Sequence, residues 1–134
     1  MRITHEADYA IRVAHCLACS RDKISAKQIS EFTGVTLRFA LKILRKMIKA
    51  DIVKSFKGVS GGYMLNRSPA DISFGEIIEA IDGPIAINHC LTAEFDCTRV
   101  AVQKKQCNFR EVFASINQQL RDELYSITLD RFVS

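Results

Sequence analysis

The sequence of 134 residues contains no long hydrophobic run and nothing that resembles a secretion signal. A helix that spans a bilayer needs about 20 mostly apolar residues, and the first ten residues, MRITHEADYA, are too charged for a signal peptide. We therefore expect a cytoplasmic protein, built as one domain or one domain plus an appendage. In that compartment the five cysteines, an odd number, are not expected to form structural disulfides.

The sequence also lacks the residue sets that enzymes use. Its three histidines, His5, His15 and His89, are not accompanied by a plausible nucleophile–base–acid set. The glycine-rich segment KGVSGG at 57–62 could suggest a phosphate loop, but neither a Walker pattern nor a dinucleotide fingerprint is present. These absences favour a binding protein over an enzyme.

Positive charge is concentrated in the first half of the chain. Residues 1–67 hold 13 Lys and Arg against 5 Asp and Glu, whereas residues 68–134 hold 6 against 10. The halves therefore carry +8 and −4, which indicates a part that binds nucleic acid and a second part with another task.

The strongest single pattern is the segment 36–49, TLRFALKILRKMIK. Its apolar residues recur at helical spacing and form one stripe. Its basic residues are spaced by four, three and four along the opposite face, with one more at the edge: Arg38, Lys42, Arg45 and Lys49, and Lys46. No acid is interleaved, so these charges repel one another unless a polyanion is present, although a solvated surface face is the plainer interpretation.

The preceding residues place this helix in a known arrangement. Ser25 and Gln28 form a capping-box pattern that opens a helix over 26–32, Gly34 supplies a turn, and Thr36 can cap the basic helix. This order predicts a helix-turn-helix, in which the first residues of the second helix reach the base edges of DNA. The candidates for those contacts are Thr36, Arg38, Phe39 and Lys42.

A hairpin is predicted directly after the basic helix. Strands over 52–56 and 63–65 flank the glycine-rich turn 57–62, which together make the wing of a winged helix. Lys54, Lys57 and Arg67 would lie on this wing, with Lys54 and Lys57 against DNA phosphates.

The remaining segments predict further helices. Residues 5–20 form an amphipathic pattern whose outer face holds Asp8, Arg12, His15 and Cys19. Its predicted inner stripe consists of Ala7, Ala10, Val13, Ala14 and Leu17. Ser73 and Glu76 form a second capping-box pattern that opens a short helix over 74–81, and an apolar stripe from Phe109 onward predicts a long helix. One chain buries only part of that stripe, so we expect a homodimer, which suits paired half-sites on double-stranded DNA.

The predicted fold class is mainly α with a small β-hairpin. The winged helix-turn-helix covers 1–68, a connecting helix 69–83, a cysteine-containing segment 84–108, and a dimerisation helix and tail 109–134.

The cysteine-containing segment holds three thiols, Cys90, Cys97 and Cys107, spaced Cys-x6-Cys-x9-Cys. Structural zinc sites usually pair ligands two to four residues apart, which these three do not. Loosely spaced thiolates can instead hold an iron–sulfur cluster, and thiol redox sensing or inert thiols are the alternatives.

Several of these stretches resemble one family. The start MRIT-xx-xDYAIR, the wing KGVSGGYML, the helix DISFGEIIEAIDG and the three-cysteine segment are similar to the Rrf2 family of dimeric winged-helix transcription regulators (IscR-, NsrR- and RirA-like). The resemblance covers nearly the whole chain. It implies that Cys90, Cys97 and Cys107 ligate an iron–sulfur cluster, with a four-iron cluster favoured over a two-iron one.

The residue that would supply the fourth ligand differs from that of IscR-like members of the family. IscR-like members carry a His three residues after the last cysteine, where this chain has Arg110, which does not ligate iron. NsrR-like members use an Asp in the first helix of the partner subunit, and Asp8 stands at the matching place. His89 and an exogenous ligand or water are the alternatives.

The resulting hypothesis is a dimeric transcription regulator whose DNA affinity is controlled by an iron–sulfur cluster. Two alternatives stay open: a winged-helix regulator that senses through thiols or zinc without a cluster, and a winged-helix module that binds a protein.

Overall fold

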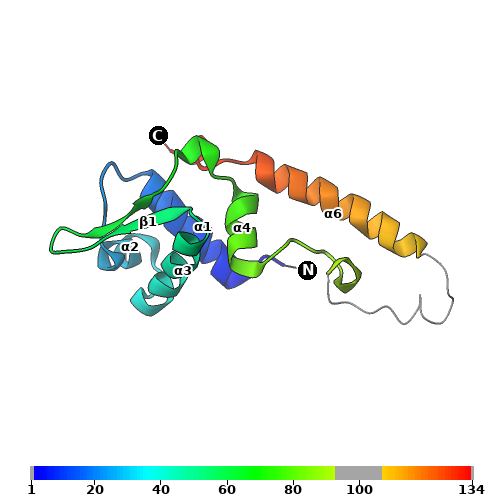
Figure 1. The fold of residues 1–134 in the computed structure, drawn as a ribbon, viewed down its shortest axis with the longest axis horizontal. Helices are drawn as coiled ribbons and strands as arrows, with labels where there is room; N and C mark the ends of the chain where they lie inside the picture. The colour runs from blue at the N-terminus through cyan, green and yellow to red at the C-terminus, as the bar shows by residue number, and fades with distance from the viewer. Residues whose placement is uncertain (1, 93–106, 134) are drawn as a thin grey trace.

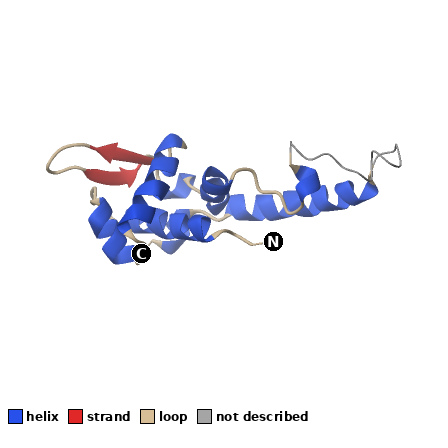
Figure 2. Cartoon of the chain, turned by 90° about the horizontal axis from the view of Figure 1, so that it is seen from below, coloured by secondary structure: helices blue, strands red, loops and turns tan. Residues whose placement is uncertain are grey.

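The computed structural model describes residues 2–92 and 107–133. The regular elements are α1 (His5–Ala18), α2 (Ala26–Thr33), α3 (Leu37–Lys49), β1 (Val53–Phe56), β2 (Gly62–Leu65), α4 (Phe74–Asp82) and α6 (Asn108–Ser126). Short 3-10 turns cover Pro69–Asp71, His89–Leu91 and Leu129–Phe132. The first four helices gather beside the hairpin, and α6 extends away from them (Figures 1 and 2). The predicted fold class is therefore confirmed. In the described part of the chain, no helix combines the length and apolar character needed to cross a membrane.

The core lies where α1, α3 and α4 meet. The predicted inner stripe of α1 is buried, and its members are Ala7, Ala10, Val13, Ala14 and Leu17. Because most of these side chains are small, the neighbouring helices pack closely against α1. The apolar stripe of α3 faces it with Ala40, Ile43, Leu44 and Met47, each no more than 1% exposed. α1 therefore contacts both the recognition helix of the predicted helix-turn-helix and the helix that precedes the cysteine-containing segment.

Local hydrogen bonds fix the turn between α2 and α3. The predicted capping box is present, because the Ser25 side chain accepts from the Gln28 amide and the Gln28 side chain accepts from the Ser25 amide. Gly34 ends α2 with a φ of 77°, a left-handed conformation that favours glycine. Thr36 Oγ1 then accepts from the Phe39 amide at 3.3 Å and begins α3.

The wing is a two-stranded antiparallel hairpin whose register runs from Val53 opposite Leu65 to Phe56 opposite Gly62. A further bridge joins Ile24 to Tyr63 and holds the segment before α2 against the wing. A Cβ at Gly62 would lie 2.6 Å from the Ile24 carbonyl oxygen, so this close approach requires glycine. The strand boundaries differ from the prediction by one residue each.

The start of α4 departs from the sequence prediction. Ser73 Oγ accepts from the Glu76 amide at 3.1 Å, which is one half of a capping box. The Glu76 carboxylate does not return to Ser73 and instead accepts from the Arg67 guanidinium. The predicted reciprocal box is therefore wrong in this half, because an ion pair with a cation competes for the carboxylate.

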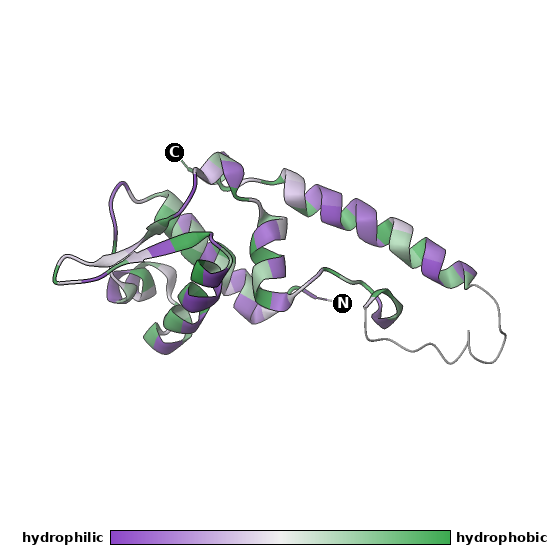
Figure 3. Ribbon diagram, in the orientation of Figure 1, coloured by the Kyte–Doolittle hydropathy of each residue, from purple (hydrophilic) through white to green (hydrophobic). Residues whose placement is uncertain are grey.

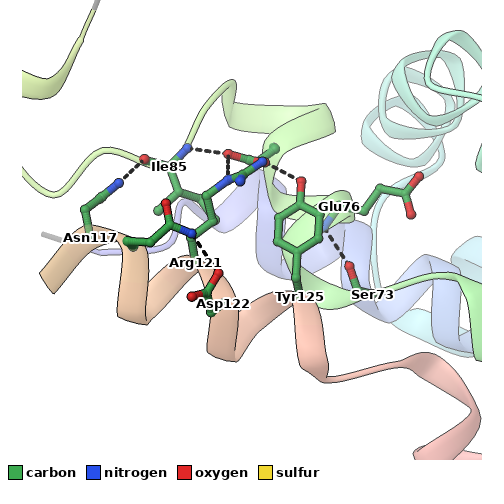
Figure 4. Close-up of polar contacts among 9 residues, drawn as sticks. Ser73, Glu76, Ile85, Asn117, Arg121, Asp122 and Tyr125 are labelled. Atoms are coloured by element: carbon green, nitrogen blue, oxygen red, sulfur yellow. Dashed lines mark hydrogen bonds and ion pairs between the residues drawn. The ribbon is translucent and has the colours of Figure 1, made fainter. Parts of the chain in front are cut away.

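α6 is held against α4 by a polar cluster (Figure 4). The Glu79 carboxylate accepts from Arg121 Nη2 at 2.9 Å, from the Tyr125 hydroxyl and from the Ile85 amide at 2.8 Å. Burial opposes ionisation of Glu79, but these hydrogen bonds together keep its pKa below the usual value. Asn117 adds a second connection, since its side-chain amide donates to the Ile85 carbonyl and accepts from the Ile87 amide, both at 2.9 Å.

The first half of α6 carries an exposed apolar stripe. Phe109, Val112 and Ile116 are 55%, 58% and 48% exposed, on a helix that has no buried residue. Figure 3 shows hydrophobic segments alternating with hydrophilic ones along this helix. The stripe continues to Leu124, which packs against the core. The single chain therefore covers only one end of the stripe that the sequence predicts for dimerisation.

Candidate nucleic-acid interface and cysteine-containing segment

The outer side of α3 is a shallow basic surface. Thr36, Leu37 and Arg38 begin it at the helix N-terminus, and Lys42 and Arg45 continue it along the next turns. These side chains line a hollow of about 840 Å³ together with Phe39 and Leu41. Of the four predicted base-contacting residues, Thr36, Arg38 and Lys42 are exposed and Phe39 is half-buried. The predicted alignment of the basic side chains along one helix face is thus present.

The expectation that this face carries positive charge alone is wrong. Glu6, on the first turn of α1, lies with Oε1 2.9 Å from Lys46 Nζ and 3.7 Å from Lys42 Nζ. The linear sequence of α3 shows no acid because the acid comes from another helix. The Glu6 side chain is 19% exposed, so this ion pair is better shielded from water than an ordinary surface pair. Among residues 2–92 and 107–133, Arg38, Arg45 and Lys49 have no ion pair.

Phe39 connects the recognition helix to α1. The Phe39 ring meets the Tyr9 ring edge-on, with 5.5 Å between the ring centroids. Lys42 Nζ lies 5.8 Å from the centroid of the Phe39 ring. Tyr9 in turn lies under the Arg12 guanidinium at 5.2 Å. Phe39 therefore has a packing role in this structure, which limits the surface it offers to DNA.

The wing presents fewer basic side chains than predicted. Lys54 and Lys57 are exposed on the hairpin, and Val59 at its tip is fully exposed. Arg67 instead turns toward α4, where it pairs with Glu76 and donates to the Asp71 and Asp51 carbonyls. The placement of Arg67 on the wing surface is therefore wrong, since three acceptors at the base of the hairpin hold it.

The two described ends of the cysteine-containing segment lie at the N-terminal end of α6. Cys90 belongs to the turn His89–Leu91, and its carbonyl accepts from Arg110 Nε at 3.3 Å. Cys107 is the N-cap of α6, where the helix dipole favours an anionic group such as a thiolate. Arg110 thus positions the Cys90 end beside the helix that Cys107 begins. Cys97 lies outside the described residues.

The predicted fourth ligand, Asp8, has an ion-pair partner within its own chain. Asp8 Oδ2 lies 3.0 Å from Arg12 Nη2, the pairing expected of an ordinary surface carboxylate. Within residues 2–92 and 107–133, no three His, Cys, Asp or Glu side chains come together in a way that could hold a metal ion. The chemistry of Cys90 and Cys107 suits iron, which prefers sulfur ligands, and Arg110 adds no competing ligand.

Three features of the site were not found from the sequence. Glu6 faces α3, Asn117 holds 85–87 against α6, and Glu79 joins Arg121 and Tyr125. Each depends on a contact between distant segments, such as Glu79 with Arg121, 42 residues apart. The one available signal was the placement of Arg121 and Tyr125 one helical turn apart, which puts them on one face.

An exposed basic second helix, followed by a hairpin, defines a winged helix-turn-helix protein of the DNA-binding class. The family model Rrf2, described as an iron-dependent transcriptional regulator, matches residues 3–134. The chain therefore belongs to the Rrf2 family of transcription regulators.

Individual relatives agree with this assignment. An rrf2-like HTH-type transcriptional regulator of Rhodobacter capsulatus is 36% identical over 96% of this chain and 89% of its own length. The regulator IscR of Pectobacterium carotovorum is 26% identical over 100% of this chain and 80% of its own length. These relatives are regulators, which agrees with the expectation that the chain is not an enzyme.

Solved structures show the same fold. The T. potens IscR structure has a TM-score of 0.69 and 26% identity, and covers 97% of this chain and 84% of that one. The structure of CymR, the global cysteine regulator of B. subtilis, has a TM-score of 0.75 at 24% identity. The match covers 97% of this chain and 94% of the CymR chain. At that identity the CymR likeness supports the fold alone.

Proposed function

We propose that this Rrf2-family regulator acts as a homodimer whose affinity for operator DNA is controlled by an iron–sulfur cluster. In this proposal Cys90, Cys97 and Cys107 are the thiolate ligands, and Asp8 of a second copy of the chain is the fourth. A bound cluster would supply iron whose ligation depends on iron supply, oxygen or nitric oxide, and a four-iron form is favoured over a two-iron one.

The observation that carries the cluster proposal is the position of Cys90 and Cys107 at the N-terminal end of α6. The Arg110–Cys90 contact and the N-cap position of Cys107 anchor both ends of the segment to the same helix end. Anchored ends lower the entropic cost of bringing the thiols together. The resemblance to IscR supports the same assignment.

DNA contacts are assigned by position and chemistry. Arg38, at the exposed start of α3, can bind guanine through two hydrogen bonds, and Thr36 and Lys42 lie beside it. Lys54 and Lys57 on the wing suit phosphate contacts, which hold the protein without reading sequence.

The contacts of α1 provide a physical link between the two sites. Asp8 pairs with Arg12, Arg12 lies over Tyr9, and Tyr9 packs against Phe39 at the start of α3. If Asp8 left Arg12 to ligate iron held by the other copy, these contacts would rearrange beside the recognition helix. Gain or loss of the fourth ligand would then bias α3 between two positions on DNA.

The second candidate function is a thiol or zinc sensor without a cluster. The structural neighbours include Staphylococcus aureus CymR in an oxidised form, a likeness that supports the fold alone, so the thiol alternative rests on the cysteines themselves. In this case the same three cysteines would oxidise or bind zinc, and the DNA-binding assignments would stand unchanged.

The deciding experiment is anaerobic purification followed by visible absorption spectroscopy and assays for iron and acid-labile sulfide. The proposal predicts a coloured protein with comparable iron and sulfide, and Cys90→Ser or Cys107→Ser should remove most of both. Cys16→Ser is the matched control because that thiol lies on α1 and should leave the content unchanged. Asp8→Ala should leave the protein coloured but speed loss of the cluster to a chelator.

A colourless protein that stays colourless after anaerobic reconstitution would reject the cluster. If the colourless wild-type chain bound zinc and Cys107→Ser did not, the second candidate function would be favoured.

A further inference from the structure

α1 carries a second pair of thiols that has no part in the proposed cluster site. Cys16 is half-buried, and Cys19, the C-cap of α1, is exposed one helical turn later. Both line a surface hollow of about 470 Å³, which Arg12, His15, Ser20, Phe32 and Thr33 complete. Two thiols that open into one hollow beside two basic side chains make a candidate site for sulfur chemistry.

His15 distinguishes Cys19 from Cys16. His15 Nε2 lies 2.9 Å from the Phe132 carbonyl oxygen and 3.4 Å from Cys19 Sγ. A carbonyl oxygen only accepts hydrogen bonds, so this contact requires a hydrogen on Nε2. The same N–H is close enough to donate to a Cys19 thiolate, which would stabilise the nucleophilic form of an exposed thiol.

Cys16 has the opposite environment. Burial, and next the nearby Cys19, raise the pKa of the Cys16 thiol, so it stays protonated more readily. This difference favours an order of events in which Cys19 reacts first and Cys16 second. The Arg12 guanidinium lines the hollow and also pairs with Asp8, so a reagent that carries negative charge would share this cation with the Asp8 carboxylate.

The spacing of the two thiols permits them to join. Residues three apart in an α-helix have Cα atoms about 5 Å apart, within the range of about 4.4–6.8 Å found across disulfides. Because Cys19 is the C-cap, closure of the bond needs adjustment only of the last helical turn.

We propose that Cys16 and Cys19 form a dithiol site that reduces anionic small-molecule disulfides and is itself oxidised to an intrahelical disulfide. The Cys19 thiolate attacks one sulfur of the small molecule, whose S–S bond breaks and releases one thiolate, leaving a mixed disulfide on Cys19. Cys16 then loses its proton to solvent, attacks the Cys19 sulfur and expels the second thiolate. Two protein thiols are oxidised, and one disulfide is reduced to two thiols.

The test uses oxidised glutathione as the probe and the purified full-length chain, kept without oxygen. Trypsin cleaves after Arg12 and Arg21, so the peptide 13–21, VAHCLACSR, contains Cys16 and Cys19 and no other cysteine. After blocking of free thiols, mass spectrometry of this peptide should show the loss of two hydrogen atoms in the wild-type chain. Cys16→Ser should instead retain a glutathione adduct on Cys19, and Cys19→Ser should stay largely unmodified.

His15→Ala, which leaves no side-chain donor, tests the role of the imidazole. In the Cys16→Ser background it should slow formation of the adduct at least about threefold, because the Nε2–H that stabilises the Cys19 thiolate is lost. Should a variant fail to fold by circular dichroism, limited alkylation of the wild-type chain gives an independent measure, with Cys19 labelled before Cys16.

Three results would overturn the proposal. The peptide 13–21 could stay reduced while peptides with Cys90 or Cys107 react, Cys16 could be labelled before Cys19, or Cys19→Ser could form an adduct as fast as Cys16→Ser does. None of these measurements depends on iron, so they are independent of the cluster proposal.

Discussion

Glu6 of α1 lies 2.9 Å from Lys46 on the recognition helix and also reaches Lys42. The acid thus partly neutralises two of the five basic side chains that the sequence of α3 presents. DNA phosphates and Glu6 compete for the same ammonium groups, so Glu6 should lower the affinity for DNA. The reduction should fall on the sequence-independent binding that phosphate contacts provide.

Glu6→Gln should therefore tighten binding to all DNA sequences several-fold and steepen the salt dependence. Each lysine released to a phosphate adds about one unit to the slope of log affinity against log salt. Fluorescence anisotropy with operator and unrelated DNA over a salt series measures both quantities. Glu31→Gln is the matched control because Glu31 is exposed on α2, and equal effects of the two variants would exclude a specific role for Glu6.

Arg38 and Lys49 should differ in what they contribute to DNA binding. Arg38 lies at the start of α3, where side chains reach base edges, so Arg38→Ala should cost about 1–3 kcal/mol on the preferred sequence and relax the preference. Lys49 ends the same helix, so Lys49→Ala should weaken binding to all sequences alike. Selection of binding sites from a random DNA pool distinguishes these effects, and identical profiles for both variants would contradict the assignment.

The sequence predicts the helices well because their signals are local. The Ser25–Gln28 capping box, the positive φ of Gly34 and the Thr36 cap are all determined by neighbouring residues. The inner stripe of α1 was also predicted residue by residue, since helical periodicity alone determines which side chains share a face.

Charge pairing between elements was not predictable in the same way. Glu6 and Lys46 are 40 residues apart in the sequence. Arg67 pairs with Glu76 of α4 and therefore does not lie on the wing surface. Periodicity shows which face a charge occupies but does not show which element faces it. The Cys-x6-Cys-x9-Cys spacing likewise predicts the chemistry of the ligands, while the anchoring of Cys90 by Arg110 depends on the packed fold.

The exposed stripe on α6 should be the dimer interface. Burying a valine side chain contributes about 1.5 kcal/mol, and a two-fold interface contains each position in both copies. Val112→Lys should therefore weaken the dimer about a hundredfold or more, since each 1.4 kcal/mol is tenfold. Sedimentation velocity over a concentration series measures this change.

Gln118→Lys is the matched control for Val112→Lys, because Gln118 lies on the polar face of α6, away from the apolar stripe. It places the same cation at an exposed polar position of the same helix and should leave the dimer intact. If Val112→Lys dimerised over the same concentration range as the wild-type chain, the interface would have to lie outside the first half of α6.

The cluster of Glu79, Arg121 and Tyr125 should make the attachment of α6 sensitive to acid. Hydrogen bonds from Arg121, Tyr125 and Ile85 outweigh burial and hold the pKa of Glu79 below its usual value. A carboxyl whose pKa is lower in the folded chain contributes stability above its unfolded pKa, and loses that contribution as the pH falls through its folded value. The midpoint of urea unfolding should therefore decline more steeply with acid in the wild-type chain than in Glu79→Gln, which has no carboxyl to protonate.

Two further variants separate this effect from general acid sensitivity. Glu123→Gln removes an exposed carboxylate from the same helix and should keep the wild-type pH profile. Tyr125→Phe removes one donor to Glu79 and should cost about 1 kcal/mol at neutral pH, with a smaller acid-dependent decline than the wild type. If Glu79→Gln and Glu123→Gln gave the same profile, the acid sensitivity would have to arise outside this cluster, and the attachment of α6 would depend chiefly on apolar contacts such as Leu124 with the core.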